Sequence, residues 1–193
     1  SPFPFTALPL RVVPVLHVSQ MVIARSCWLI LADLGADVVK VEPLKGDRTP
    51  RLPGVAYGFF AMYSRNKRSL ALETTTQAGQ QVARRLISQS DVLIENFRPG
   101  TTSRLGIAYE DVQRVNPRAV YASISGFGNT EVPPSPYREW AAYAPIVEGM
   151  AGLYEYSREP ELAPRPALAG ALGDTAPGLY AEIGVLAPLH PRE

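Results

Sequence analysis

Short apolar runs rich in β-branched residues alternate with longer amphipathic stretches along most of the chain. The runs predict strands over residues 11–18, 37–42, 69–73, 91–95 and 119–124. Apolar positions at helical spacing predict helices between them, over residues 20–34, 76–90 and 109–115. An alternation of strands and helices is typical of parallel βαβ units. We therefore predict an α/β protein with a Rossmann-like, open parallel sheet and flanking helices.

Local sequence predicts where several elements end. Ser19 is a suitable N-cap for the first helix, and Gly35 is a suitable C-terminal stop. Pro43 ends the second strand, whereas Pro14 interrupts the first. Residues 44–58 combine proline, glycine and charge, so they predict a loop. The apolar face of the second helix is expected to comprise three residues: Val82, Leu86 and Ile87.

The pattern changes in the last third of the chain. Residues 130–138 contain three prolines, which is typical of a linker or loop. Residues 141–153 predict an apolar helix, and a charged, proline-rich loop follows over 155–166. Asp174 is a natural N-cap for a further apolar helix over 175–189.

This change divides the chain into a Rossmann-like domain over residues 1–138 and a second part over residues 139–193. The second part consists of apolar helices and a loop. The sequence lacks an initiator Met and stops just after an apolar run. We therefore expect a fragment that is cut or processed at both ends and continues toward a missing C-terminal half.

Composition and charge exclude several classes of protein. Apolar residues make up 46% and charged residues 19% of the 193, an ordinary globular mixture. The net charge of +1 offers no electrostatic footprint for nucleic acid or a membrane surface. No stretch approaches the roughly 20 apolar residues of a membrane span, and no signal peptide is visible. We predict a cytoplasmic protein with neither nucleic acid nor membrane as a partner.

Few residues suit metal binding or nucleophilic catalysis. Two histidines, His17 and His190, and a single cysteine leave little for a metal site, so we predict none. The histidines lie at opposite ends of the chain, which disfavours a Ser or Cys nucleophile that needs a nearby base. We interpret Cys27 as a core residue. The motif Gly126-x-Gly128 lacks a third glycine and predicts a tight strand exit rather than a dinucleotide site.

Several local sequences, taken in order, carry a more specific signal. They are Leu31-Ala-Asp-Leu-Gly-Ala-Asp-Val-Val-Lys-Val-Glu-Pro43, Asn66-Lys-Arg-Ser69, Asp91-Val-Leu-Ile-Glu-Asn-Phe-Arg-Pro-Gly100, Arg104-Leu-Gly106, Asn116-Pro-Arg118, Ser123-Ile-Ser-Gly-Phe-Gly128 and Gly170-Ala-Leu-Gly-Asp-Thr-Ala-Pro-Gly178. With these motifs the chain resembles the class III CoA-transferases, which include formyl-CoA and carnitine CoA-transferases and are related to α-methylacyl-CoA racemases. The resemblance covers only the N-terminal half of the usual family member.

The resemblance implies that residues 1–138 bind CoA or acyl-CoA as a substrate, without a metal. It places Asn96 and Phe97 at the CoA carrier, with Phe97 against the adenine. It also implies that Arg104 meets the CoA phosphates, for which a guanidinium is suited by its bidentate geometry. Four further CoA-contacting positions are implied: Leu72, Thr75, Lys67 and Arg138.

The resemblance identifies Asp174 with the family's catalytic aspartate, and this role is compatible with the N-cap. The carboxylate would attack the acyl-CoA thioester and give an aspartyl mixed anhydride. The freed CoA thiolate would then form an enzyme-bound thioester, from which the acceptor acid takes CoA through a second anhydride. We expect a CoA-transferase that moves CoA between an acyl-CoA and a carboxylic acid.

Two departures from the family pattern keep alternatives open. Ile23-Ala24-Arg25 stands where the family has Ala-Gly-Pro, which favours a non-catalytic CoA-binding fragment or partner subunit. Trp140 stands where the racemases have His, which disfavours an α-methylacyl-CoA racemase. Family members form interlocked dimers, so we expect a homodimer or a complementing chain. Apolar residues on the last helix are expected to be exposed for this purpose: Ile183, Leu186 and Leu189.

Overall fold

A five-stranded parallel sheet forms the centre of the computed structural model, which describes residues 8–18, 23, 25–52, 58–129, 134–156, 158–165 and 172–190. The strands are β1 (Pro14–Val18), β2 (Asp37–Glu42), β3 (Lys67–Ala71), β4 (Val92–Glu95) and β5 (Val120–Ser123). Their order in the sheet is β3-β2-β1-β4-β5, so the direction of winding reverses between β1 and β4. The predicted α/β fold with an open parallel sheet is confirmed.

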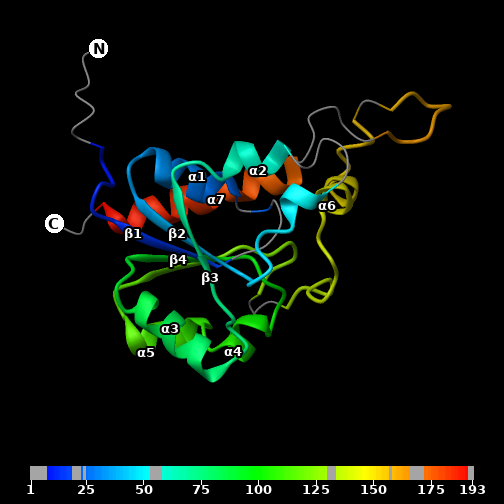
Figure 1. Cartoon of the computed structure of the whole chain (residues 1–193). Helices are drawn as coiled ribbons and strands as arrows, with labels where there is room; N and C mark the ends of the chain where they lie inside the picture. Colours follow the sequence, from blue (N-terminus) through cyan, green and yellow to red (C-terminus); the bar gives the residue numbers. More distant parts are fainter. Residues whose placement is uncertain are drawn as a thin grey trace, which may run out of the picture.

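Helices cover both faces of the sheet (Figure 1). The helices on one face are α1 (Arg25–Asp33), α2 (Gly58–Tyr63) and α7 (Leu172–Leu189). Those on the other face are α3 (Gln77–Ile87), α4 (Thr101–Leu105) and α5 (Tyr109–Val115). Helix α6 (Ala144–Met150) lies beyond the sheet and contacts α7, and a short 3₁₀ helix spans Thr49–Arg51. Helix α7, the last described element, packs against the first helix, α1.

Neighbouring strand residues point to opposite faces, and each face has its own core. Val15 of β1 packs with Trp28 of α1 and Val185 of α7. The next residue, Leu16, packs with Ile87 of α3 on the other side. Both sides of the central strands are thus buried, which explains why β1 and β4 are mostly apolar instead of alternating.

Two predicted boundaries agree with the structure, and the prediction for Pro14 was wrong. Strand β2 has the predicted bounds, and Gly35 follows α1 with a φ of +102°, a conformation that glycine adopts without strain. Pro14 begins β1 instead of interrupting it, because the first residue of a strand tolerates proline. Ser19 lies outside the described residues. The boundary at residue 138 stays a prediction.

Other expectations about helices and strands were wrong. Val82 is 43% exposed, and its neighbour Ala83 belongs to the buried face of α3 in its place. Helix α4 was not predicted, and α2 begins at the last residue of the expected loop, because helices of five or six residues leave no extended apolar periodicity. Strand β3 lies two residues earlier than expected. It is an edge strand with little burial, so the apolar pattern does not define its ends.

The last helix begins earlier than its sequence suggests. Helix α7 starts at Leu172, so Asp174 lies within its first turn and is not the N-cap. The amide of Gly173 donates instead to Oε1 of Glu148 on α6, at 2.8 Å, and this contact satisfies a helix-terminal donor. On the same helix Ile183 is exposed as expected, whereas Leu186 and Leu189 are partly buried against the first core. No helix in the described part of the chain is long and apolar enough to span a membrane.

Helices α1 and α7 approach each other very closely at Gly178. A Cβ atom at this position would lie 2.0 Å from the Ser26 hydroxyl oxygen and 3.3 Å from the amide nitrogen of Cys27. The same Ser26 hydroxyl donates a hydrogen bond to the carbonyl of Thr175, at 3.0 Å. This contact fixes the first turn of α7, and with it Asp174, against α1.

Replacing Gly178 with Ala should therefore destabilise the protein by about 1–3 kcal/mol, because the new methyl group forces Ser26 from its hydrogen bond or the helices apart. Gly184→Ala is the matched control, since nothing lies within 4 Å of its Cβ position on the same helix. This variant should gain about 0.5–1 kcal/mol from helix propensity. Urea denaturation measures both changes, and equal stabilities for the two variants would contradict the close contact.

Candidate functional site

A cavity of about 370 Å³ lies at the carboxyl edge of the sheet. It is lined by Ile23, which comes after β1, by Asn96 and Phe97 after β4, and by residues 124–127 after β5. The side-chain amide of Asn96 donates to the carbonyl of Ile23, at 3.1 Å, and so joins the segments on either side of the winding reversal. Open α/β sheets place their ligands at such a crevice.

The buried carboxylate of Glu95 shapes the turn that carries Asn96 and Phe97. Its Oε2 accepts the backbone N–H of Phe97, at 2.8 Å, and its Oε1 accepts the hydroxyl of Tyr121, at 3.3 Å. Burial raises the pKa of the Glu95 carboxyl, while these donors favour its charged form. This residue was not predicted as part of the site, although an acidic residue at the end of a buried strand was a visible signal.

Cationic and aromatic side chains border the same cavity. Arg98 and Arg138 line it, together with Trp140 and Tyr143. Helix α4 begins at its wall with Thr101, whose hydroxyl oxygen accepts a hydrogen bond from the exposed guanidinium of Arg104, at 3.2 Å. The arrangement suits an anionic ligand with a planar ring, because guanidinium groups pair with phosphate oxygens and aromatic rings stack.

Asp174 projects into this cavity from the first turn of α7. Among the described residues, none donates a hydrogen bond to its carboxylate. Burial, and after it the negative charge of Glu148, raise the pKa of the Asp174 carboxyl from 3.8 to about 6. These two effects outweigh the helix dipole, which favours a charged carboxylate in a first turn. Asp174 is therefore mostly ionised at neutral pH but poorly stabilised.

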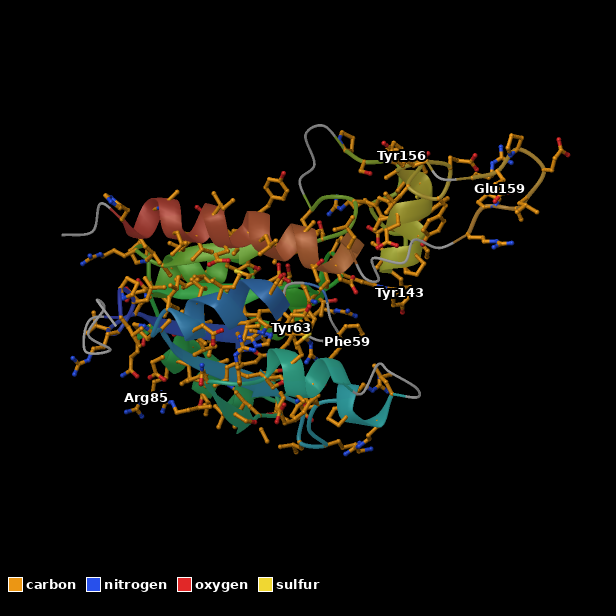
Figure 2. The ribbon with its side chains drawn as sticks, turned by 90° about the horizontal axis from the view of Figure 1, so that it is seen from above. Phe59, Tyr63, Arg85, Tyr143, Tyr156 and Glu159 are labelled. Atoms are coloured by element: carbon orange, nitrogen blue, oxygen red, sulfur yellow. The ribbon has the colours of Figure 1, made fainter. Side chains whose placement is uncertain are left out.

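Two neighbours of Asp174 were not singled out from the sequence. Glu148 is 8% exposed, and its second oxygen accepts the hydroxyl of Tyr154, at 3.1 Å. Tyr63 of α2 lies beside Phe59 (Figure 2), and burial and the charge of Asp174 raise the pKa of its hydroxyl. A single acidic residue inside the apolar stretch 141–153 was the available signal for Glu148.

Four residues that the resemblance associates with CoA do not line the cavity. Arg104 stands at its border, and Leu72 packs against the same core as Phe97. Thr75 is exposed, and its hydroxyl donates to Glu73, at 2.6 Å. Lys67 begins the edge strand β3, on the far side of β2 and β1 from β4.

Lys67 belongs to a separate cluster of charges. It donates to the carbonyl of Tyr63, and its ammonium lies 5.8 Å from the ring centroid of Trp28. Burial, followed by the charges of Arg25 and Lys40, lowers the pKa of Lys67 to about 7. Lys67 thus belongs to a cationic group with Arg25 and Lys40, and none of the three lines the cavity.

Arg25 does not occupy the cavity, although small residues are expected at this point in the family pattern. Its guanidinium is 3% exposed and donates to Asp47, at 3.0 Å, and to the hydroxyl of Thr49, at 2.6 Å. Lys40 pairs with the same Asp47 carboxylate. Burial opposes the charged form, but these contacts hold the pKa of Asp47 well below its usual range. Of the two described residues that replace the family's Ala-Gly-Pro, Ile23 and Arg25, only Ile23 lines the cavity.

No histidine occurs among the described residues that line the cavity, and Trp140 stands exposed at its wall. The described residues also contain no group of three His, Cys, Asp or Glu side chains arranged to hold a metal ion. The candidate chemistry of the cavity therefore rests on the Asp174 carboxylate, with Asn96, Phe97 and the two arginines around it.

Known proteins resemble this chain over nearly its whole length. A Streptomyces avermitilis protein named formyl-CoA:oxalate CoA-transferase is 39% identical over 95% of this chain, which is 44% of the relative. The succinyl-CoA–L-malate CoA-transferase beta subunit of Chloroflexus aurantiacus is 36% identical over 97% of this chain and 47% of its own length. The chain thus spans about half the length of the curated relatives it matches.

A solved structure shows the same architecture. The crystal structure of a CAIB/BAIF family protein from Brucella suis superimposes with a TM-score of 0.85 and 34% identity, over 95% of this chain and 50% of that one. The family described as CoA-transferase family III matches residues 10–193. The chain therefore belongs to CoA-transferase family III.

Proposed function

We propose that this protein transfers CoA from an acyl-CoA to a carboxylic acid acceptor, with Asp174 as the nucleophile. The observation that carries the proposal is the position of Asp174. Its carboxylate lies in the same cavity as Asn96, Phe97 and two arginines, at the carboxyl edge of the sheet. The names of the relatives, which are CoA-transferases, support the same reaction class.

The proposed reaction begins when the Asp174 carboxylate attacks the thioester carbonyl. A carbon–oxygen bond forms, the carbon–sulfur bond breaks, and CoA leaves as a thiolate. The thiolate then attacks the Asp174 carbonyl of the mixed anhydride, which releases the original acid and leaves a CoA thioester on Asp174. The acceptor carboxylate displaces CoA from Asp174, and the thiolate finally attacks the acceptor's carbonyl and frees Asp174. A partly desolvated carboxylate without donors suits the first step.

CoA recognition is proposed for residues that follow β4 and β5, at the cavity and its border. Phe97 offers a ring for the adenine, and Asn96 offers amide groups for the carrier. Arg104 and Arg138 supply positive charge for the phosphates, and so does Arg98, which was not predicted from the sequence. Leu72, Thr75 and Lys67 stay proposed contacts, although they stand away from the described cavity.

Two other functions remain as alternatives within the same family. A racemase needs a histidine paired with a carboxylate, and none of the described lining residues is a histidine. A non-catalytic CoA-binding partner would retain the CoA contacts without using Asp174.

We also propose that a second copy or a complementing chain covers the exposed apolar side chains of α7, which are Leu172, Leu179, Tyr180 and Ile183.

Replacing Asp174 with Asn should abolish CoA transfer and covalent trapping without unfolding the protein. The amide keeps the shape of the side chain but removes the anionic nucleophile. In the active form of the protein, incubation with an acyl-CoA and then hydroxylamine should convert Asp174 to a hydroxamate, which peptide mass spectrometry detects. Asp37→Asn, an exposed change on β2, is the control and should trap normally. Full activity in Asp174→Asn would disprove the nucleophile and leave the non-catalytic alternative.

The charge of Glu148 should set part of the pH dependence. Glu148→Gln removes a negative charge beside Asp174, so the Asp174 pKa should fall below 6, while burial keeps it above 3.8. The acid limb of the pH–rate profile should therefore move to lower pH, by about one unit or less. Tyr63 and Arg138, which also face this region, are unchanged in the variant. The exposed Glu155→Gln is the control, and a limb that stays in place or moves upward would refute the coupling.

Removing the guanidinium of Arg104 should weaken CoA binding by about tenfold or more, because a charge-assisted phosphate contact is lost. Calorimetry with CoA measures the effect. Arg85 on α3 is a matched control, since its side chain points outward away from α6 and α7 (Figure 2). If Arg104→Ala and Arg85→Ala bind CoA equally well, Arg104 has no role in CoA binding.

A further inference from the structure

We propose that a second cavity beside Asp174 holds the acyl group, and that it selects apolar monocarboxylic acyl groups over those with a second carboxylate. This inference rests on the proposed function and specifies its substrate class. The cavity has a volume of about 360 Å³ and lies between α6, the first turn of α7 and the loop after β5.

The two cavities adjoin each other along a shared wall. Four residues line both of them: Ile23, Ser125, Gly126 and Ala142. Along α7, Gly173 and Ala176 line the second cavity, whereas Asp174 lines the first. The nucleophile thus stands at the boundary, where a thioester carbonyl would have CoA on one side and its acyl substituent on the other.

The linings of the two cavities differ in chemistry. The first contains Arg98 and Arg138, whereas no lysine, arginine or histidine occurs among the described residues of the second. Most of its wall is apolar. Besides the shared Ile23 and Ala142, six apolar side chains line it: Val147, Ala151, Leu153, Leu172, Ala176 and Pro177. A cavity of about 150 Å³ with an apolar lining already accommodates benzene, so this one has room for a branched or aromatic acyl group.

Glu148 supplies the charge discrimination. It is the one ionisable side chain among the described residues that line the second cavity. Its two oxygens already accept hydrogen bonds from Gly173 and Tyr154, so the carboxylate is fixed in place. A substrate with a second carboxylate would bring a like charge into a largely apolar space with no cation to pair it, which is unfavourable.

A matched pair of CoA thioesters tests the proposal by calorimetry. Succinyl-CoA and 4-methylpentanoyl-CoA have acyl groups of nearly the same shape, but one ends in a carboxylate and the other in an isopropyl group. The apolar thioester should bind at least about tenfold more tightly, because each buried methylene contributes about a fourfold gain. Glu148→Gln should narrow this difference by improving the binding of succinyl-CoA.

A filling substitution locates the acyl group. Ala176→Leu places a larger side chain in the second cavity. The variant should bind 4-methylpentanoyl-CoA little more tightly than CoA, while its affinity for CoA itself is unchanged. Ala187→Leu, at an exposed position on the same helix, is the control and should still bind 4-methylpentanoyl-CoA more tightly than CoA. Circular dichroism confirms that both variants are folded.

The outcomes separate this inference from the proposed function. If CoA binds but the two thioesters bind equally well, or if succinyl-CoA binds more tightly, the acyl subsite is wrong and the CoA site survives. The acyl subsite is also wrong if Ala176→Leu still binds 4-methylpentanoyl-CoA more tightly than CoA. This result is expected if another segment of protein fills the cavity. If neither CoA nor its thioesters bind, both the proposed function and this inference fail.

Discussion

The position of Asp174 depends on how closely α7 can approach α1. The absence of a side chain at Gly178 lets the helices meet at the Ser26 hydroxyl, and Ser26 in turn bonds the carbonyl of Thr175, the residue after Asp174. A second close contact lies one residue before Asp174. A Cβ at Gly173 would stand 2.7 Å from Val147 of α6. Asp174 is thus positioned by its neighbours in the chain rather than by hydrogen bonds to its own carboxylate.

The three acidic residues at the cavity differ in how well hydrogen bonds stabilise their charge. Both carboxylate oxygens of Glu148 and of Glu95 accept hydrogen bonds, as buried polar groups normally do. Asp174 has no donor among the described residues, and its negative neighbour makes ionisation harder. The well-satisfied acids organise the backbone around the cavity, whereas the poorly satisfied one is left with its lone pairs available for chemistry.

Much of the fold was predictable because its signals are local. The bounds of β2 follow from a short apolar run closed by Pro43, and the end of α1 follows from Gly35. Tertiary effects explain what was missed. On α3 it is Ala83, not Val82, that faces the protein core, because the orientation of a helix depends on what it packs against.

The candidate site was predictable in part. Asn96, Phe97, Arg138 and Asp174, to which the motif resemblance assigns roles, line one cavity, and the roles themselves stay predictions. The first turn of α7 extends beyond the expected cap because Glu148, on another helix, takes the amide of Gly173. The sequence spacing between residues 148 and 173 does not predict this contact, because it forms only when α6 and α7 pack together.

The raised pKa of Asp174 also bears on the direction of the proposed reaction. In a mixed anhydride the CoA thiolate can attack either carbonyl, and the carboxylate that is the weaker base leaves more readily. A substrate acid that departs into water has a pKa of about 4, compared with about 6 for Asp174 in the site. Departure of the substrate acid is therefore favoured over departure of Asp174. The desolvated, like-charged surroundings of a single carboxylate would in this way bias the anhydride toward the enzyme-bound thioester instead of back toward the starting acyl-CoA.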